Sequence, residues 1–293
     1  MLLERAYAKI NLTLDVLRRR PDGYHEVDMV MQSIDLSDLV WLDCRSDSEI
    51  VLDLNAGHIP SDERNLAVQA AMLFRKYTGI RAGVQINLEK NIPVAAGLAG
   101  GSSDAAAVLR GLNRLFDTGL TSDELADMGA EIGSDVPFCI YGGTAIARGR
   151  GEVLERIAHP CHLYVLLIYP RVFVSTADIY QALQPTDFVT AVQSERMVQA
   201  LMEQDVDAVP YLVHNVMQHV TFAAYPGVKQ LADKVESVTR HPVHMSGSGP
   251  TLFCLAPTVQ QANRMYNALR GVMRDVHLSH FVSNISNSGD GEV

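Results

Sequence analysis

A glycine-rich segment carries the clearest chemistry in the sequence. It follows a predicted strand at residues 83–88 and runs into a predicted helix that starts at Ser102. Backbone N–H groups at the start of a helix have no partners within the helix and lie at the positive end of its dipole, so they attract anions. Glycine leaves room for phosphate oxygens to approach these groups. The predicted nucleotide-binding residues are Pro93, Val94, Ala95, Ala96, Gly97, Leu98, Ala99, Gly100, Gly101, Ser102 and Ser103.

The same segment, residues 93–103, also has a simpler interpretation. It matches neither GxxxxGK[ST] nor GxGxxG, the two common glycine-rich nucleotide motifs. A glycine-rich connector with Ser102 or Ser103 as the helix N-cap gives the same pattern. Both interpretations stay open at this point.

Polar residues at two other places suit charge stabilisation and proton transfer. Lys9 and Asn11 alternate with Ile10 and Leu12 on a predicted strand, so they share one face of it. Asp135 lies in a turn that follows a predicted helix. Taken alone, Lys9 is an ordinary strand lysine in solvent, Asn11 could bond to a neighbouring backbone group, and Asp135 is a common turn residue.

Three segments, in order along the chain, point to one family. They are AYAKINL at residues 6–12, the glycine-rich segment, and MSGSGPT at residues 245–251. Together they resemble the three motifs of the GHMP small-molecule kinases, and the resemblance covers nearly the whole chain. It implies an α+β, two-domain fold: an N-terminal domain of the ribosomal-S5-domain-2-like type, a C-terminal ferredoxin-like domain, and an active site in the cleft between them.

The sequence pattern breaks where these two domains are expected to meet. An apolar strand is predicted at residues 163–168, after a break that places the boundary behind residue 157. Residues 1–157 are then the N-terminal ATP-binding domain and residues 158–283 the C-terminal domain. Residues 284–293 are small and polar, which predicts a flexible tail.

The resemblance implies that Lys9 and Asp135 are the catalytic pair of an ATP-dependent kinase. Phosphoryl transfer depends mostly on positioning and on stabilisation of charge. In this role Asp135 orients the acceptor hydroxyl and takes up its proton late, while Lys9 stabilises charge on the transferring group. Magnesium is expected to arrive with ATP, because no cluster of histidines or carboxylates resembles a metal cage, and no metal-ligating residue is assigned.

Further segments narrow the resemblance to one branch of the family. RPDGYHE at residues 20–26, GSDVPF at 133–138 and VSTADIY at 174–180 are similar to the kinases that phosphorylate the 2-hydroxyl of diphosphocytidyl methylerythritol, in the non-mevalonate pathway to isoprenoid precursors. Aromatic faces can sandwich the cytosine base, and His and Thr side chains can bind its polar edge. Tyr180 also fits ordinary packing on an amphipathic helix, beside Ile179 and Leu183. The implied substrate-binding residues are Asn11, Tyr24, His25, Thr176 and Tyr180.

Two features of the motifs leave structural alternatives. Residues 245–251 fit a tight hairpin between two predicted strands, whereas the resemblance implies that they complete the cleft around the phosphates or the acceptor. Ala95, Ala96 and Ala99 stand where glycine is frequent in the wider family. Alanine disfavours positive φ, which leaves the backbone path of the loop open.

Two other functions remain as alternatives. One is a GHMP kinase for another small alcohol, of the homoserine or mevalonate type. The aromatic residues of the substrate site argue against it, because those alcohols offer no base to stack. The other is a nucleotide-binding regulator without catalysis. Lys9 and Asp135 argue against that function, since a non-catalytic relative has no chemical need for both.

Composition excludes several kinds of partner. The chain has 24 basic and 34 acidic residues, a net charge of −10 and a pI near 5.4, so no binding to nucleic acid is expected. The longest apolar run, residues 163–169, is much shorter than the ~20 residues that span a bilayer, and the N-terminus has no signal-peptide core. We therefore expect a cytoplasmic protein that acts on a small molecule, without membrane partners.

Hydrophobic periodicity predicts the secondary structure around these motifs. Thr121 and Glu124 have the form of a capping box, and Gly79 is a helix stop. The four cysteines, Cys44, Cys139, Cys161 and Cys254, are far apart and are expected to be reduced and mostly buried. Helices are expected at residues 66–77, 102–116, 121–132, 176–183, 195–202, 228–239 and 259–272. Strands are expected at residues 10–17, 27–34, 39–42, 50–54, 83–88, 163–168, 243–245, 251–255 and 276–282, and around glycines 142–143 and 149–151.

Overall fold

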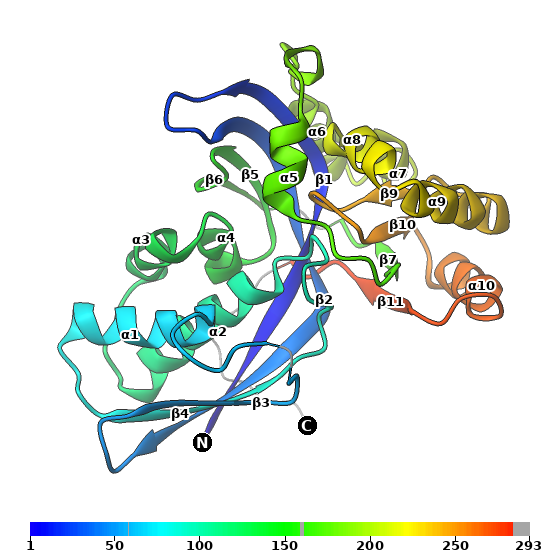
Figure 1. The fold of residues 1–293 in the computed structure, drawn as a ribbon. Coiled ribbons are helices and arrows are strands. Elements are labelled where there is room, and N and C mark those ends of the chain that lie inside the picture. The colour runs from blue at the N-terminus through cyan, green and yellow to red at the C-terminus, as the bar shows by residue number, and fades with distance from the viewer. Residues whose placement is uncertain (58, 159–160, 284–293) are drawn as a thin grey trace.

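Two very long antiparallel strands run through the first half of the chain. The computed structural model describes residues 1–57, 59–158 and 161–283. Strands β1 (Leu2–Arg19) and β2 (His25–Arg45) pair along nearly their whole lengths and cross the molecule in Figure 1. In the described residues they form the centre of a seven-stranded sheet with β3 (Ile50–Leu54), β4 (Gly83–Glu89), β5 (Thr144–Gly149), β6 (Val153–Ile157) and β8 (His214–Asn215).

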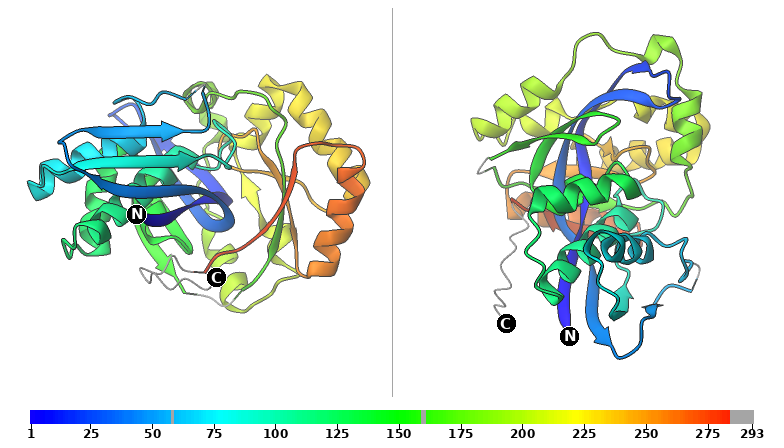
Figure 2. Two further views of the ribbon diagram at one scale, coloured as in Figure 1. Left: turned by 90° about the horizontal axis from the view of Figure 1, so that it is seen from below. Right: turned by 90° about the vertical axis from the view of Figure 1, so that its left-hand side faces the viewer.

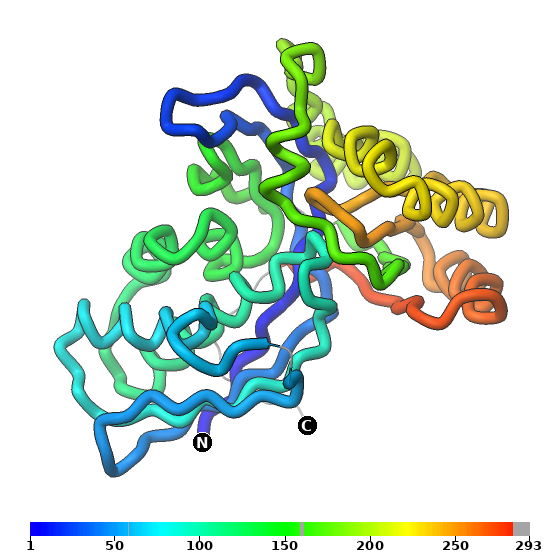
Figure 3. The backbone as a smooth tube through the Cα atoms, in the orientation of Figure 1, coloured from blue at the N-terminus to red at the C-terminus, as the bar shows by residue number. Residues whose placement is uncertain are grey.

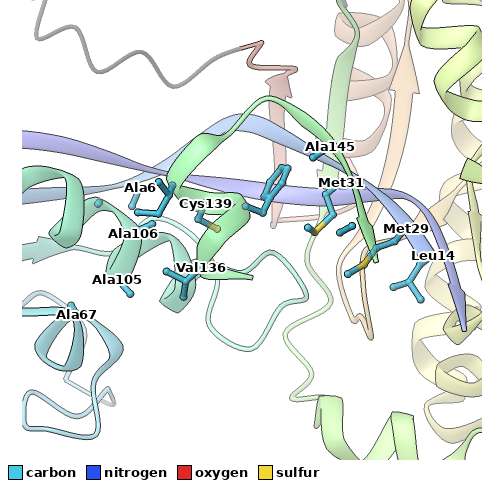
Figure 4. Close-up of a cluster of buried hydrophobic side chains, with 14 of the residues drawn as sticks. Ala6, Leu14, Met29, Met31, Ala67, Ala105, Ala106, Val136, Cys139 and Ala145 are labelled. Atoms are coloured by element: carbon cyan, nitrogen blue, oxygen red, sulfur yellow. The ribbon is translucent and has the colours of Figure 1, made fainter. Parts of the chain in front are cut away.

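Four helices of the first half cover this sheet. They are α1 (Leu66–Thr78), α2 (Gly100–Leu115), α3 (Ser122–Ile132) and α4 (Val136–Tyr141). Helix α2 packs on β1 and β2, with α1 and α4 beside it (Figure 1). Alanines on the buried side of α2, such as Ala105 and Ala106, let the helix approach the strands closely, and they lie in the hydrophobic core of Figure 4.

The second half of the chain forms a smaller antiparallel sheet with helices on its outer side. Its strands are ordered β11 (Val276–His280), β7 (Tyr164–Ile168), β10 (Leu252–Ala256) and β9 (His244–Met245). Helices α9 (Pro226–Thr239) and α10 (Val259–Arg270) lie along the outer face, as Figure 2 shows. The remaining elements are α5 (Thr176–Ala182), the 3-10 turn η1 (Pro185–Asp187), α6 (Ser194–Met202), α7 (Val209–Leu212) and α8 (Met217–Ala224).

The two halves share a core and a strand pair. Ile10 and Leu12 of β1 are fully buried in one hydrophobic cluster with Val165 of β7 and Phe253 of β10. The short strand β8 returns from the second half and pairs with β1 in parallel, Thr13 opposite His214. Strand β1 is therefore covered on both faces from Ala8 to Val16, and the expectation of a half-buried strand was wrong for this reason.

The predicted fold class agrees with this α+β arrangement. Strand β6 ends at Ile157 in the first sheet and β7 begins at Tyr164 in the second, which supports the division after residue 157. That division stays a prediction, because β8 of the second half completes the first sheet. The predicted flexible tail, residues 284–293, lies outside the described residues.

Most predicted elements are present, and the differences are local. The strands expected at 27–34 and 39–42 are one strand, β2, and the helix expected from Ser102 begins at Gly100. Elements α4, α7, α8 and β8 were not predicted. Cys139, Cys161 and Cys254 are buried, as expected. Within the described residues, no helix combines the length and the apolar character needed to cross a membrane.

Candidate active site

A cleft of about 1340 Å³ lies between the two halves of the chain and contains most of the predicted site. Its walls come from β1, the loop between β4 and α2, the start of α4, helix α5 and the β9–β10 turn. Two predicted nucleotide-binding residues do not line it. Leu98 is buried in the hydrophobic core, and Ser103 turns its hydroxyl to the Tyr7 carbonyl oxygen at 2.7 Å. Both residues therefore attach the loop to the rest of the protein and do not face the cleft.

The loop ends at the first turn of α2, whose backbone N–H groups have no side-chain cap. The N-cap of α2 is Ala99, without a side-chain cap, so the interpretation of Ser102 or Ser103 as N-cap was wrong. The first backbone bond at this end runs from Ser103 N to Ala99 O at 2.9 Å. The amides of Gly100, Gly101 and Ser102 come before it and have no acceptor within the helix. These three residues line the cleft, so this helix start has the features of an anion-binding site.

Two alanines of the loop adopt the backbone conformation that glycine would provide. Ala95 has φ 52° and Ala99 has φ 57°, both in the left-handed region. Each such residue costs roughly 1–2 kcal/mol, so other contacts must hold the loop. Lys9 N donates to Leu98 O at 3.1 Å, and Ser246 Oγ donates to Gly97 O at 2.9 Å. The loop thus keeps its shape through bonds to both halves of the chain.

Lys9 and Asp135 meet in the cleft. Lys9 Nζ lies 3.6 Å from Asp135 Oδ2 and donates a hydrogen bond to Asn11 Oδ1 at 2.8 Å. The pleat of β1 points Lys9 and Asn11 to the same side, as predicted. Asp135 precedes α4, and its side chain makes no cap bond to that helix. The carboxylate instead faces the Lys9 ammonium, which is 7% exposed and needs a partner of opposite charge.

A nearby thiol takes no part in this pair. Cys139 of α4 lies 3.3 Å from Ser103 Oγ behind the loop. Burial raises the pKa of the Cys139 thiol to about 12. A protonated thiol is a poor nucleophile and a poor metal ligand. The Cys139 thiol is therefore not a candidate for the chemistry of the cleft, and Lys9, Asn11 and Asp135 remain its predicted polar centre.

One end of the cleft is aromatic. The rings of His25 and Tyr180 are stacked, with centroids 5.1 Å apart and an interplanar angle of 26°, and Phe188 meets His25 edge-on at 6.0 Å. Tyr24 is 55% exposed and lies under the Arg150 guanidinium, 5.0 Å away. The ring that faces Tyr180 in this structure is thus His25 and not Tyr24.

The protonation states at this end follow from burial. Desolvation, together with the nearby positive charge of Arg19, lowers the pKa of His25 below its usual value, so the ring is neutral at pH 7. Burial also raises the pKa of the Tyr180 hydroxyl, which stays protonated. Thr176 lines the same cleft and shares a hydrogen bond of 2.8 Å with Ser248 Oγ. The aromatic end offers neutral donors and acceptors to a ligand.

The turn at residues 245–251 fits both interpretations given to it. It is the hairpin between β9 and β10, and it also touches the loop. A Cβ on Gly97 would lie 2.3 Å from Ser246 O, which shows how closely the two backbones pack. Asn215 Nδ2 donates hydrogen bonds to Met245 O at 2.7 Å and to Gly247 O at 2.8 Å, and these bonds stabilise the turn. Figure 3 traces the backbone of both segments.

Sequence reasoning missed several charged residues of the cleft wall. Lys90 and Asp104 lie at the two ends of the glycine-rich segment, and Arg19, Arg64 and Arg150 also line the cleft. A lysine just before and an aspartate just after such a loop are a usable sequence signal. Among the described residues there is no group of three or more His, Cys, Asp or Glu that could hold a metal ion.

Comparisons with known proteins identify the family. The model of the GHMP kinases N terminal domain matches residues 65–143, and that of the GHMP kinases C terminal matches residues 197–275. A 4-diphosphocytidyl-2-C-methyl-D-erythritol kinase of Brevibacillus brevis is 49% identical over 289 residues, which cover 99% of this chain and 98% of that protein. This chain belongs to the GHMP kinase family. As a GHMP kinase it is an ATP-dependent phosphotransferase, which confirms the predicted class of enzyme.

Other proteins similar to this GHMP kinase point to the same family and fold. The protein of the same name from Shouchella clausii is 50% identical, over 93% of this chain and 92% of its own length. A crystal structure of 4-(cytidine 5'-diphospho)-2C-methyl-D-erythritol kinase has a TM-score of 0.82 at 34% identity, and the match covers 96% of this chain and 99% of that one. A homoserine kinase from Cytophaga hutchinsonii has a TM-score of 0.76 at 18% identity, which shows the shared fold alone.

Proposed function

We propose that this GHMP kinase transfers the γ-phosphoryl group of ATP to the 2-hydroxyl of 4-diphosphocytidyl-2-C-methyl-D-erythritol, a step of the non-mevalonate route to isoprenoid precursors. The observation that carries the proposal is the pair of Lys9 and Asp135, 3.6 Å apart, in a cleft that is also lined by the uncapped start of α2 and by the rings of His25 and Tyr180. The relatives whose names state this activity cover nearly the whole chain.

The helix start fits the triphosphate of ATP. The unpaired amides of Gly100, Gly101 and Ser102 point their dipoles at the cleft. A Cβ on Gly101 would meet nothing nearer than Leu66 Cδ1 at 3.4 Å, and both residues line the cleft, so the space beside this glycine is not filled by other side chains. Magnesium would come with the nucleotide and keep several waters, as a hard cation does beside phosphates.

In the proposed catalytic step Lys9, Asn11 and Asp135 each have a separate role. Asp135 accepts the hydrogen bond of the 2-hydroxyl and orients its oxygen toward the phosphorus atom. As the new O–P bond forms and the bond to ADP breaks, the hydroxyl proton passes to the Asp135 carboxylate. Lys9 stabilises the negative charge on the transferring group, and Asn11 holds the Lys9 ammonium in place.

The aromatic end would hold the cytidine part of the substrate. Tyr180 and Tyr24 offer ring faces, and His25 and Thr176 offer polar atoms for the edge of the base. In the structure His25 is stacked against Tyr180, so a base that stacks on the same face of Tyr180 must displace the His25 ring. We keep the cytoplasmic location and the absence of nucleic-acid and membrane partners as parts of this proposal.

The test is an ADP-release assay with several acceptors. The purified protein is given ATP, magnesium and, in turn, the diphosphocytidyl substrate, the same alcohol without its cytidine, homoserine and mevalonate. We expect turnover with the first acceptor alone. Equal turnover of homoserine or mevalonate would point to a kinase for another small alcohol. ATP binding without turnover of any acceptor would point to a regulator.

A further inference from the structure

A buried cluster of charges lies beneath the loop at residues 93–99 and takes no part in the steps above. Lys90 Nζ contacts Asp38 Oδ2 and lies 2.5 Å from Asp104 Oδ2. All three side chains are at most 7% exposed. Asp38 belongs to β2, Lys90 follows β4, and Asp104 lies near the start of α2. The cluster therefore joins the sheet, the loop and the helix.

The cluster touches both ends of the loop. The second oxygen of Asp38 accepts hydrogen bonds from Asn91 N at 2.5 Å and from Ile92 N at 2.7 Å, immediately before the loop begins. At the other end, a Cβ on Gly100 would lie 3.1 Å from Ile92 Cγ2 and 3.4 Å from Lys90 Nζ. The start of α2 thus packs against Lys90 and Ile92, and both of these residues are bonded to Asp38.

The charges of the cluster do not cancel when all three groups are ionised. Two carboxylates with one ammonium would leave an uncompensated negative charge under the helix start, which would repel phosphate. Burial raises the pKa of Asp104 well above its usual range; Lys90 opposes this effect and Asp38 adds to it. Burial therefore favours the neutral form of Asp104, which lacks this excess negative charge. Among the described residues Asp104 Oδ1 has no hydrogen-bond partner, although the side chain lines the cleft.

We infer that Asp38, Lys90 and Asp104 are positioning residues, which hold the two ends of the loop in the arrangement that binds ATP. The inference rests on the proposed function for the identity of the nucleotide site. Asp38 is decisive for the test, because its side chain is fully buried and is not part of the cleft wall. Any effect of Asp38 on ATP must therefore be indirect, through the loop or through its partners Lys90 and Asp104.

The test compares Asp38→Ala with a matched control, Glu4→Ala. Glu4 is also a buried carboxylate; it pairs with Arg110 and Arg114, in the part of α2 away from the loop. We expect both variants to lower the melting temperature. Asp38→Ala alone should weaken ATP binding about tenfold or more in calorimetry, the effect of roughly one charge-assisted hydrogen bond. Its affinity for the diphosphocytidyl substrate should stay within about twofold, since that end of the cleft is unchanged.

Two outcomes would overturn the inference: unchanged ATP affinity in a folded Asp38→Ala protein, or an equal loss in Glu4→Ala. If Asp38→Ala does not fold, the pair Asp104→Asn and Asp104→Ala answers the question. Asparagine keeps an oxygen for Lys90 without a charge, so ATP affinity should stay within about threefold, while alanine loses about tenfold. Equal ATP affinities in these two variants would also overturn the inference.

Failure of the proposed function is a separate result. It is visible in the wild-type protein, as ATP binding without turnover of the diphosphocytidyl substrate. The ATP affinities of the variants are measured without any acceptor. They therefore report on the loop whichever alcohol the enzyme phosphorylates.

Discussion

Ser246 donates a hydrogen bond of 2.9 Å to the carbonyl oxygen of Gly97, and the two residues come from opposite halves of the chain. The bond closes the glycine-rich loop onto the β9–β10 turn. Gly97 has φ 75°, and its α-carbon leaves no room for a side chain on that side. The proposed nucleotide site therefore depends on this contact between the halves.

Gly97→Ala tests the contact. The added Cβ would lie 2.3 Å from Ser246 O, so the turn and the loop must separate. We expect a loss of at least ~2 kcal/mol in unfolding free energy together with weaker ATP binding. Gly119→Ala is the control, because Gly119 also has positive φ but nothing lies within 4 Å of its added Cβ. A loss of stability no larger than in Gly119→Ala, with normal ATP affinity, would contradict the close packing.

Gly101→Val tests the phosphate site directly. The new side chain has room on its protein side, where Leu66 lies 3.4 Å away, but its branches enter the space assigned to phosphate. Nucleotide affinity should fall by about 1–3 kcal/mol, through loss of a charge-assisted contact. Isothermal titration with ATP measures it. A folded variant with wild-type ATP affinity would move the phosphate site away from this helix start.

Asp135→Asn tests the proposed catalytic role of the Asp135 carboxylate. The amide keeps the shape but cannot accept the hydroxyl proton, so kcat should fall by at least ~10²-fold with a modest change in ATP affinity. Asp123→Asn is the control: Asp123 accepts a bond of 2.7 Å from Tyr141 on the neighbouring helix and lies outside the cleft. Steady-state kinetics should show near-normal turnover for the control. Near-normal turnover of Asp135→Asn would reduce this residue to a structural role.

Tyr180→Ala tests the cytidine end. Loss of one stacking face costs roughly 1–3 kcal/mol in complexes with bases, so KM for the diphosphocytidyl substrate should rise about tenfold while ATP affinity is retained. Tyr180→Phe keeps the ring and should be much milder. If Tyr180 serves core packing instead, Tyr180→Ala will lower the melting temperature and weaken both ligands alike. Melting curves and both affinities on the same protein separate the two outcomes.

His244 gives a prediction for pH. Burial lowers the pKa of His244 to about 4, although its bond to the Pro210 carbonyl oxygen opposes this effect. In the unfolded chain His244 binds its proton near pH 6.5, whereas in the folded protein it does so only near pH 4. Unfolding is therefore favoured as pH falls from about 6.5 toward 4, and above pH 6.5 His244 has little effect on the free energy of unfolding. Between about pH 7.5 and pH 5 the residue should remove about 2 kcal/mol of stability. Urea unfolding should show that this part of the pH dependence is lost in His244→Gln; an unchanged slope would contradict it.

The sequence was sufficient for the elements with a clear period and a clear cap. Helix α1 ends at Gly79 in the left-handed region, and Thr121 forms the capping box of α3 with Glu124, as predicted. Lys9 and Asn11 share a face because strand alternation is local. Helix α4 has only six residues with a proline in its first turn, and β8 has two residues, so neither shows a period.

The rest of the site depends on contacts between distant residues. Ala99 adopts positive φ because the surrounding bonds hold the loop, and local preference alone predicts the opposite. The stack of His25 on Tyr180 joins residues 155 positions apart, and periodicity carries no information on it. Asp38 and Lys90 are each unremarkable in the sequence, and only the fold brings them together.

The pairing of β8 with β1 bears on how this enzyme can be divided. A fragment that stops after residue 157 lacks His214 and Asn215, so the side of β1 near Thr13 and Leu14 becomes an unprotected sheet edge. Such edges recruit strands from other molecules and promote aggregation. The fragment would also expose the side chains of Ile10 and Leu12, which pack against the second half of the chain. We therefore expect the N-terminal half to be insoluble when expressed alone and to be recovered by co-expression of the C-terminal half.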